Sequence, residues 1–126
     1  MRTAFGVWIT GLPSAGKSTI AWALERALVA CTVPCEVLES DEVRRRLTPA
    51  PTYSEEERDR FYAAFAWMGG LLVRHGVPVI FDGTARLRAY RDRARREVSR
   101  FLEVYVDTPI EVCRERDPKG IWRAAD

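Results

Sequence analysis

The sequence predicts an α/β fold in which a mainly parallel sheet carries helices on both faces. Short, nearly continuous apolar runs alternate with longer segments of helical period along all 126 residues. The first run, 4–10, leads into a glycine-rich turn and has the unbroken hydrophobicity of a strand buried on both faces. No fixed repeat or low-complexity linker divides the chain, so we expect one domain over residues 1–126.

Four apolar runs are the expected strands. Each of the first three is followed by a segment of helical period, which is how parallel neighbours in a sheet are connected. The four runs cover 4–10, 35–39, 77–81 and 101–106.

Two helices are expected in the first half of the chain. The first begins near Lys17, and Pro34 prevents it from continuing into the second strand. The second is short and runs from Ser40 to Leu47, ahead of a loop that contains two prolines. The apolar side of the first helix comprises Ile20, Leu24, Ala27 and Leu28.

The later helices have start signals of their own. Ser54 and Glu57 have the spacing of a capping box, in which the hydroxyl accepts from a helical N–H and the glutamate reaches back. Thr108 is expected to cap a last helix, with Pro109 in its first turn. Residues 117–126 are polar and expected to be irregular. The apolar stripes of the two intervening helices are Phe61, Phe65, Met68 and Leu72, then Leu87, Tyr90, Ala94 and Val98.

Composition excludes several classes of protein. With 47% hydrophobic and 30% charged residues and a net charge of +2, the chain is typical of a folded globular domain. Its 3 cysteines lack framework spacing and indicate free thiols. The longest apolar stretch, 61–73, is too short to cross a bilayer, so we expect a cytoplasmic protein with no membrane partner. Arginines in 86–100 alternate with acids on a half-apolar helix, which favours a solvated face over nucleic-acid binding.

A phosphate-binding loop is predicted between the first strand and the first helix. The residues match G-x-x-x-x-G-K-[ST] in the strand–loop–helix context that this motif requires. The glycines permit a backbone whose N–H groups converge on phosphate oxygens, and the helix dipole points its positive end at the same anion. The motif comprises Gly11, Leu12, Pro13, Ser14, Ala15, Gly16, Lys17 and Ser18. It predicts a three-layer P-loop NTPase fold that binds ATP.

The residues after the loop suggest phosphoryl transfer. Lys17 is expected to act catalytically by supplying a full charge to the β- and γ-phosphates, and Ser18 to ligate Mg²⁺. Thr19 is expected near the α-phosphate. These roles predict an ATP- and Mg²⁺-dependent kinase that acts on a hydroxyl of a small molecule.

Five blocks along the chain carry a family resemblance: 8–21, 41–44, 53–58, 103–113 and 114–120. The block at 103–113, Glu-Val-Tyr-Val-Asp-Thr-Pro-Ile-Glu-Val-Cys, is too long to match by chance. In order and spacing, the blocks resemble the adenylylsulfate kinase family. The resemblance implies that the γ-phosphate of ATP is transferred to the 3′-hydroxyl of adenylyl sulfate, with Mg²⁺ as the metal.

The resemblance also implies roles for single residues. Asp41 would lie beside the acceptor hydroxyl as a base or orienting group, while simple N-capping of the helix that follows stays open. Arg44 and Arg58 match arginines that hold the anionic substrate. Arg116 would cover the adenine base of ATP, and Lys119 would lie near the acceptor.

The chain departs from the family pattern in two substrate-contacting stretches. The family has an Asn and arginines after its Asp-Arg pair, where this chain continues with Asp59-Arg60. After the third strand the family has Ser-Phe-Ile-Ser-Pro, and this chain has Asp82-Gly83-Thr84. Asp82 could hold the Mg²⁺ water shell, contact a different acceptor, or simply belong to a turn. A kinase for another small hydroxyl acceptor is therefore an alternative.

The family continues past the point where this sequence ends. The resemblance thus implies a sheet that lacks the last strand and helix, with a lid region shortened at about 114–126. We expect either a fragment or a minimal version of the fold. An ATP-binding protein without catalytic activity is a further alternative, and a homodimer is left open.

Overall fold

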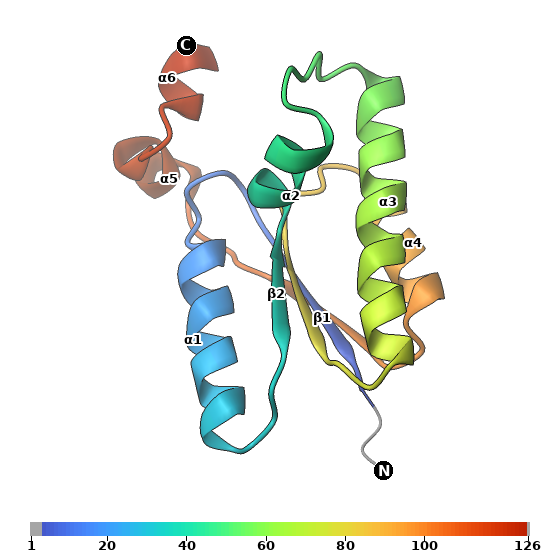
Figure 1. Ribbon diagram of the computed structural model, residues 1–126. Coiled ribbons are helices and arrows are strands. Elements are labelled where there is room, and N and C mark those ends of the chain that lie inside the picture. Colours follow the sequence, from blue (N-terminus) through green and yellow to red (C-terminus); the bar gives the residue numbers. More distant parts are fainter. Residues whose placement is uncertain (1–3, 126) are drawn as a thin grey trace.

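The computed structural model describes residues 4–125 and contains one four-stranded sheet in the order β2-β3-β1-β4 (Figure 1). All three strand pairings are parallel. The predicted α/β fold and its strands are confirmed, with boundaries shifted by one or two residues. The strands are β1 (Gly6–Thr10), β2 (Glu36–Glu39), β3 (Val79–Asp82) and β4 (Phe101–Tyr105).

Helices cover both faces of the sheet. α1 lies against one face, and α3 and α4 pack together on the other, which gives three layers (Figure 1). α2, α5 and α6 lie at the end where the strands finish. The helices are α1 (Lys17–Ala30), α2 (Ser40–Leu47), α3 (Glu55–Arg74), α4 (Arg88–Glu97), α5 (Ile110–Arg116) and α6 (Ile121–Ala125).

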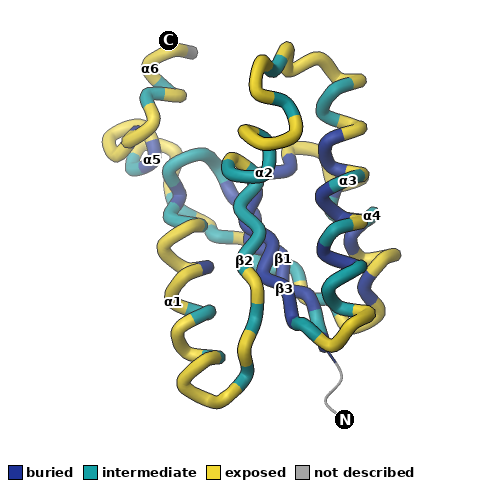
Figure 2. The backbone as a smooth tube through the Cα atoms, in the orientation of Figure 1, coloured by how far each residue is buried: buried dark blue, intermediate teal, exposed yellow. Residues whose placement is uncertain are grey.

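The core lies on both sides of β1 and β3, whose residues are all buried (Figure 2). On the α3 side, Trp8 stacks on Phe81 with ring centroids 4.9 Å apart and meets Phe65 edge-on. Phe81 reaches this position because α3 has a glycine there: a Cβ on Gly69 would lie 2.1 Å from its Cζ. On the α1 side, Ile9 packs with its neighbours from β1 and β3. Successive side chains of β1 point to opposite faces of the sheet, so this strand contributes to the core on both sides.

Two apolar stripes were only partly predicted. Ile20 is 41% exposed and Ala27 is exposed, whereas Ala21 is fully buried against the sheet beside Leu24. The helical period fixes the spacing of a stripe but not its phase, and the small Ala21 lets α1 approach closely. Leu87 is 42% exposed because it precedes the first residue of α4. The remaining stripe residues of α3 and α4 are buried or partly buried as expected.

Two start signals differ in detail from the prediction. The Ser54 hydroxyl accepts from the Glu57 N–H at 3.1 Å as expected, but Glu57 reaches back to the N–H groups of Thr52 and Tyr53. The predicted cap at Thr108 is wrong. α5 begins two residues later, and the Thr108 hydroxyl donates instead to a carbonyl of the phosphate loop.

The polar C-terminal segment is more ordered than expected. The expectation that residues 117–126 are irregular is wrong over Ile121–Ala125, which form α6. Asp117 explains the helix, because its carboxylate accepts from the N–H groups of Trp122 and Arg123 at 3.0 and 2.9 Å. Within residues 4–125, no helix combines the length and hydropathy needed to span a membrane.

Candidate active site

A cavity of about 460 Å³ opens at the carboxyl ends of the strands. This edge is where open parallel sheets bind ligands, because the loops that follow each strand meet there. The phosphate loop forms its floor, and the start of α2 and the segment after α5 form its walls. The lining residues are Pro13, Ser14, Gly16, Lys17, Ser18, Thr19, Glu39, Ser40, Asp41, Asp82, Thr84, Arg116, Pro118, Lys119 and Ile121.

The phosphate loop has the backbone that the motif predicts. Gly16 adopts a left-handed φ of 103° directly before α1, and Ser14 has a φ of 68°. Gly11 has a φ of 153°, and a Cβ there would lie 2.9 Å from the Val106 carbonyl oxygen. Because α1 starts right after Gly16, the free N–H groups of its first turn and the positive end of its dipole face the cavity.

The Lys17 side chain turns back toward the phosphate loop. Its Nζ donates to the Leu12 carbonyl at 2.9 Å. Burial lowers the pKa of the Lys17 ammonium, and the nearby Asp82 carboxylate opposes this shift. The Asp82 carboxylate therefore offsets only part of the cost of burying the Lys17 charge, which favours the binding of a polyanion in the cavity.

Ser18, at the start of α1, and the buried Asp82, at the end of β3, form a polar pair in the cavity. The Ser18 hydroxyl donates to Asp82 Oδ2 at 2.6 Å, and Asp82 is 4% exposed. Burial raises the pKa of Asp82, while the Ser18 hydrogen bond and the Lys17 charge act in the opposite direction. A hydroxyl and a carboxylate at this spacing are the hard oxygen donors that Mg²⁺ prefers, so the residues present fit that metal.

The segment that follows Asp82 is fixed from the interior of the sheet. The indole of Trp8 donates to the Gly83 carbonyl at 2.9 Å, and the Thr10 hydroxyl donates to the Thr84 carbonyl at 2.6 Å. Both carbonyls therefore face the protein, and the Thr84 side of the segment lines the cavity.

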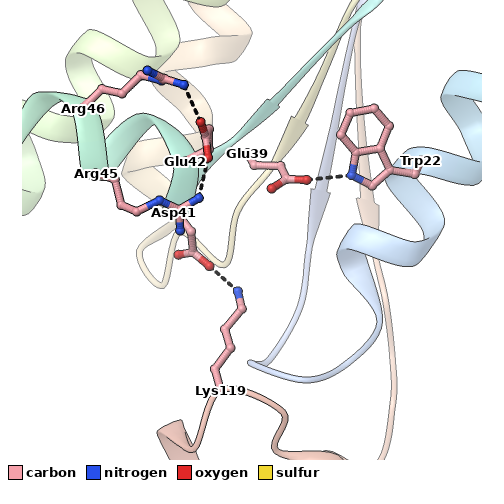
Figure 3. A network of polar contacts seen from close by, with 7 residues as sticks. All are labelled: Trp22, Glu39, Asp41, Glu42, Arg45, Arg46 and Lys119. Atoms are coloured by element: carbon pink, nitrogen blue, oxygen red, sulfur yellow. Dashed lines mark hydrogen bonds and ion pairs between the residues drawn. The ribbon is translucent and has the colours of Figure 1, made fainter.

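Asp41 lies on the cavity wall formed by α2 and contacts the wall formed by the segment after α5. It forms an ion pair with Lys119 that joins α2 to the segment after α5 (Figure 3). The N-capping alternative for Asp41 is wrong: Glu39 is the N-cap residue, and no side-chain cap bond forms there within the described residues. The carboxylate is thus free of the helix and lies at the cavity.

Arg116 lies over the phosphate loop. A Cβ on Gly16 would be 3.8 Å from the Arg116 guanidinium. The segment that follows is tied to the same loop, because the indole of Trp122 donates to the Pro13 carbonyl at 3.0 Å. Arg116, Lys119 and Ile121 therefore close one side of the cavity.

The two predicted acceptor arginines lie outside the cavity lining. The Arg44 guanidinium stacks over Phe61, 4.1 Å from the ring centroid, and lies 5.4 Å from that of Tyr53. One buried nitrogen of Arg44 has no hydrogen-bond partner among the described residues. Arg58 lies 6.0 Å from the Tyr53 ring. The structure groups both arginines around Tyr53, between α2 and α3.

Several lining residues were not predicted, and Glu39 is the clearest of them. It ends β2 opposite Asp82 in the parallel register, and its carboxylate accepts from the Trp22 indole at 2.6 Å (Figure 3). A carboxylate at the end of a strand was the signal used for Asp82, and it applies equally here. Ser40, Thr84, Pro118 and Ile121 have no comparable pattern in the sequence.

A parallel sheet with this loop at its central strand, and with a cavity bordered by Lys17, Ser18 and carboxylates, defines a P-loop kinase. A family model described as adenylylsulphate kinase matches residues 3–126. The adenylyl-sulfate kinase of Synechococcus sp. (strain JA-3-3Ab) is 39% identical over 124 residues, which cover 98% of this chain and 70% of that protein. The chain belongs to the adenylylsulphate kinase family.

Other relatives and solved structures agree. The probable adenylyl-sulfate kinase of Archaeoglobus fulgidus is 41% identical, with 97% of this chain and 79% of that protein covered. The structure of the Mycobacterium tuberculosis APS kinase in complex with AMPPNP and APS has a TM-score of 0.90 and 31% identity. That match covers 99% of this chain and 76% of the other. For the adenylyl-sulfate kinase of Microcystis aeruginosa, 41% identical, this chain spans 94% of its own length and 66% of the relative.

Proposed function

We propose that this chain is an ATP-dependent adenylyl-sulfate kinase whose residues 1–126 act as a single domain. The hydroxyl oxygen of the acceptor forms a bond to the γ-phosphorus of ATP, the bond from that phosphorus to the bridging oxygen breaks, and ADP leaves. The observation that carries the proposal is the cavity itself: the phosphate loop forms its floor, and Asp41 forms its wall. Family membership supports adenylyl sulfate as the acceptor.

The polyphosphate is held by the loop and the helix that follows. Backbone N–H groups from Ser14 to Ser18 and the Lys17 ammonium bind its oxygens, while Arg116 covers the adenine base of ATP. Support for this orientation comes from the left-handed Gly16 and from the partly compensated charge of Lys17. The same groups stabilise charge that spreads over the transferring phosphoryl group.

Mg²⁺ would be held by Ser18 directly and by Asp82 through water. Held there, the metal would supply positive charge that neutralises part of the charge of the phosphates. The hydrogen bond between Ser18 and Asp82 supports this assignment because it already places two hard oxygen donors side by side.

Asp41 is proposed to take or orient the proton of the acceptor hydroxyl. Lys119 pairs with Asp41, and its positive charge would attract an anionic acceptor. Arg44 and Arg58 bind the anionic part of the acceptor beyond the cavity. The unpartnered buried nitrogen of Arg44 supports this role, since an anion would supply the missing hydrogen-bond partner.

A coupled assay of ADP release tests the proposal. Purified protein with Mg·ATP should release ADP only when adenylyl sulfate is added, and mass spectrometry should find the 3′-phosphorylated product. Lys17→Met, which removes the loop cation, should abolish the signal. Turnover with a sugar hydroxyl and none with adenylyl sulfate would establish the alternative acceptor. Saturable ATP binding with no transfer to any acceptor would establish a binding protein without catalysis.

A further inference from the structure

Two carbonyl groups of the phosphate loop are bound by side chains from the far end of the chain. The Thr108 hydroxyl donates to the Ala15 carbonyl at 2.8 Å, 93 residues away. The Trp122 indole donates to the Pro13 carbonyl at 3.0 Å, 109 residues away. A third loop carbonyl, that of Leu12, accepts from Lys17 and from the Ala15 N–H.

These bonds fix the orientation of two peptide groups. In a trans peptide, the carbonyl of one residue and the N–H of the next point in opposite directions. The bond to Pro13 therefore aims the N–H of Ser14 away from Trp122, and the bond to Ala15 aims the N–H of Gly16 away from Thr108. If either peptide turned over, it would present an oxygen to the phosphates in place of a donor.

The same two residues have unusual backbone angles. Ser14 has a φ of 68° and Gly16 a φ of 103°. A left-handed conformation is unfavourable for serine and persists where its surroundings hold it. Thr108 and Trp122 are the groups that hold the peptides immediately before these two residues.

Both anchors are themselves fixed. Asp117, which is 5% exposed, accepts from the Trp122 N–H at 3.0 Å, and the Arg114 guanidinium lies 5.5 Å from the indole ring centroid. Thr108 lies in the loop between β4 and α5, and its N–H donates to the Val106 carbonyl at 3.1 Å. The anchors thus connect the loop to β4 and to α6.

We infer that Thr108 and Trp122 are positioning residues for polyphosphate binding: they orient the Ser14 and Gly16 peptides so that their N–H groups face the nucleotide. The inference rests on the proposed function only in that the ligand of the loop is a nucleotide. Neither residue contacts the reacting atoms. Their effect is on affinity for the phosphates, and it reaches the acceptor side only through this loop.

The test is isothermal titration of the full chain with Mg·ATP and with tripolyphosphate. Thr108→Val removes the hydroxyl at nearly constant volume, and Trp122→Phe keeps an aromatic ring without its donor. Each variant should bind both ligands about 3- to 10-fold more weakly, the range expected for loss of one hydrogen bond. In kinetics, the KM for ATP should rise while the KM for the acceptor stays at the wild-type value. Thr108→Ser should restore wild-type affinity.

Trp67→Phe is the matched control, because Trp67 is 52% exposed on α3. Wild-type affinity in both Thr108→Val and Trp122→Phe overturns the inference, whatever their melting temperatures. Equal losses in Thr108→Ser and Thr108→Val overturn it for the hydroxyl. If one variant does not fold, the other decides alone. A wild-type chain that binds Mg·ATP but does not phosphorylate adenylyl sulfate contradicts the proposed function and leaves this test intact.

Discussion

Lys119 forms an ion pair with Asp41, although 78 residues separate them in the chain. The two side chains are 58% and 52% exposed, so the pair adds little to the stability of the fold. The location of the pair is what matters, because it connects the first turn of α2 to the segment after α5 (Figure 3), and both residues line the cavity. An acceptor that enters here meets both charges at once.

Asp41→Asn should lower kcat by about 10²- to 10⁴-fold, the usual contribution of a positioned acid or base. The amide keeps the shape of the side chain but cannot take a proton. Binding of Mg·ATP, measured by titration, should stay within about 2-fold of wild type, because Asp41 belongs to α2 and contributes no group to the phosphate loop. Asp92→Asn on α4 is the control and should leave kcat unchanged. A kcat for Asp41→Asn equal to that of the control would rule out the proposed role.

Arg44→Lys should raise the KM for adenylyl sulfate about 10-fold or more, because lysine keeps the charge but loses the planar stack on Phe61 and the two-pronged donor. The KM for ATP should not change. Arg45→Lys is the matched control: Arg45 is the next residue in α2 and pairs with Glu42 at the surface. The same acceptor KM in both variants would place substrate binding elsewhere.

Asp82→Asn should lower magnesium-dependent activity about 10- to 100-fold, as loss of a second-shell metal partner does. Titration of activity against Mg²⁺ measures the effect. In the wild type, Mg²⁺ affinity should fall as the pH drops through the raised pKa of Asp82, because the protonated carboxyl is a poor metal partner. The Asn variant should lack this pH dependence. An identical pH profile in both proteins would contradict the metal-holding role of Asp82.

The same variant should be more stable than the wild type at neutral pH. The folded-state pKa of Asp82 is raised above its ordinary value of 3.8, so its favourable contribution is fully present below 3.8 and is lost as the pH rises through the folded pKa. Above the folded-state pKa, the wild type therefore carries a buried carboxylate that Asn removes. The melting temperature of Asp82→Asn should exceed that of the wild type at pH 7, and the difference should shrink toward pH 3.8.

Gly69→Ala should destabilise the fold by about 1–3 kcal/mol, the range for overpacking a close-packed core. The added Cβ would lie 2.1 Å from Phe81 Cζ, and the ring is already in contact with Trp8. Urea unfolding measures the loss. Ala63→Ser, at an exposed position of the same helix, should change stability by less than about 0.5 kcal/mol. A wild-type midpoint for Gly69→Ala would show that the core relaxes without cost.

Local patterns predicted the elements because their signals lie within a few residues of one another. The phosphate loop, the start of α1 and the end of β3 at Asp82 all follow from neighbouring residues and hydrophobic period. The cap predicted at Thr108 failed for the opposite reason. A threonine hydroxyl before a helix can accept from a helical N–H or donate to a carbonyl elsewhere. The Thr108 hydroxyl donates to the Ala15 carbonyl, which lies 93 residues away. The exposed Ile20 failed because period alone does not fix which side of α1 meets the sheet.

The sequence by itself determined the parallel α/β order, the loop from Gly11 to Ser18 and the family of this chain, since each depends on residue types at short, fixed spacing. Only the tertiary structure decided which charges meet. It joined Asp41 to Lys119 and Ser18 to Asp82, left Arg44 and Arg58 outside the cavity lining, and brought Thr108 and Trp122 to the phosphate loop. The physical reason is that such contacts join elements far apart in the chain, and local residue spacing carries no record of how those elements pack.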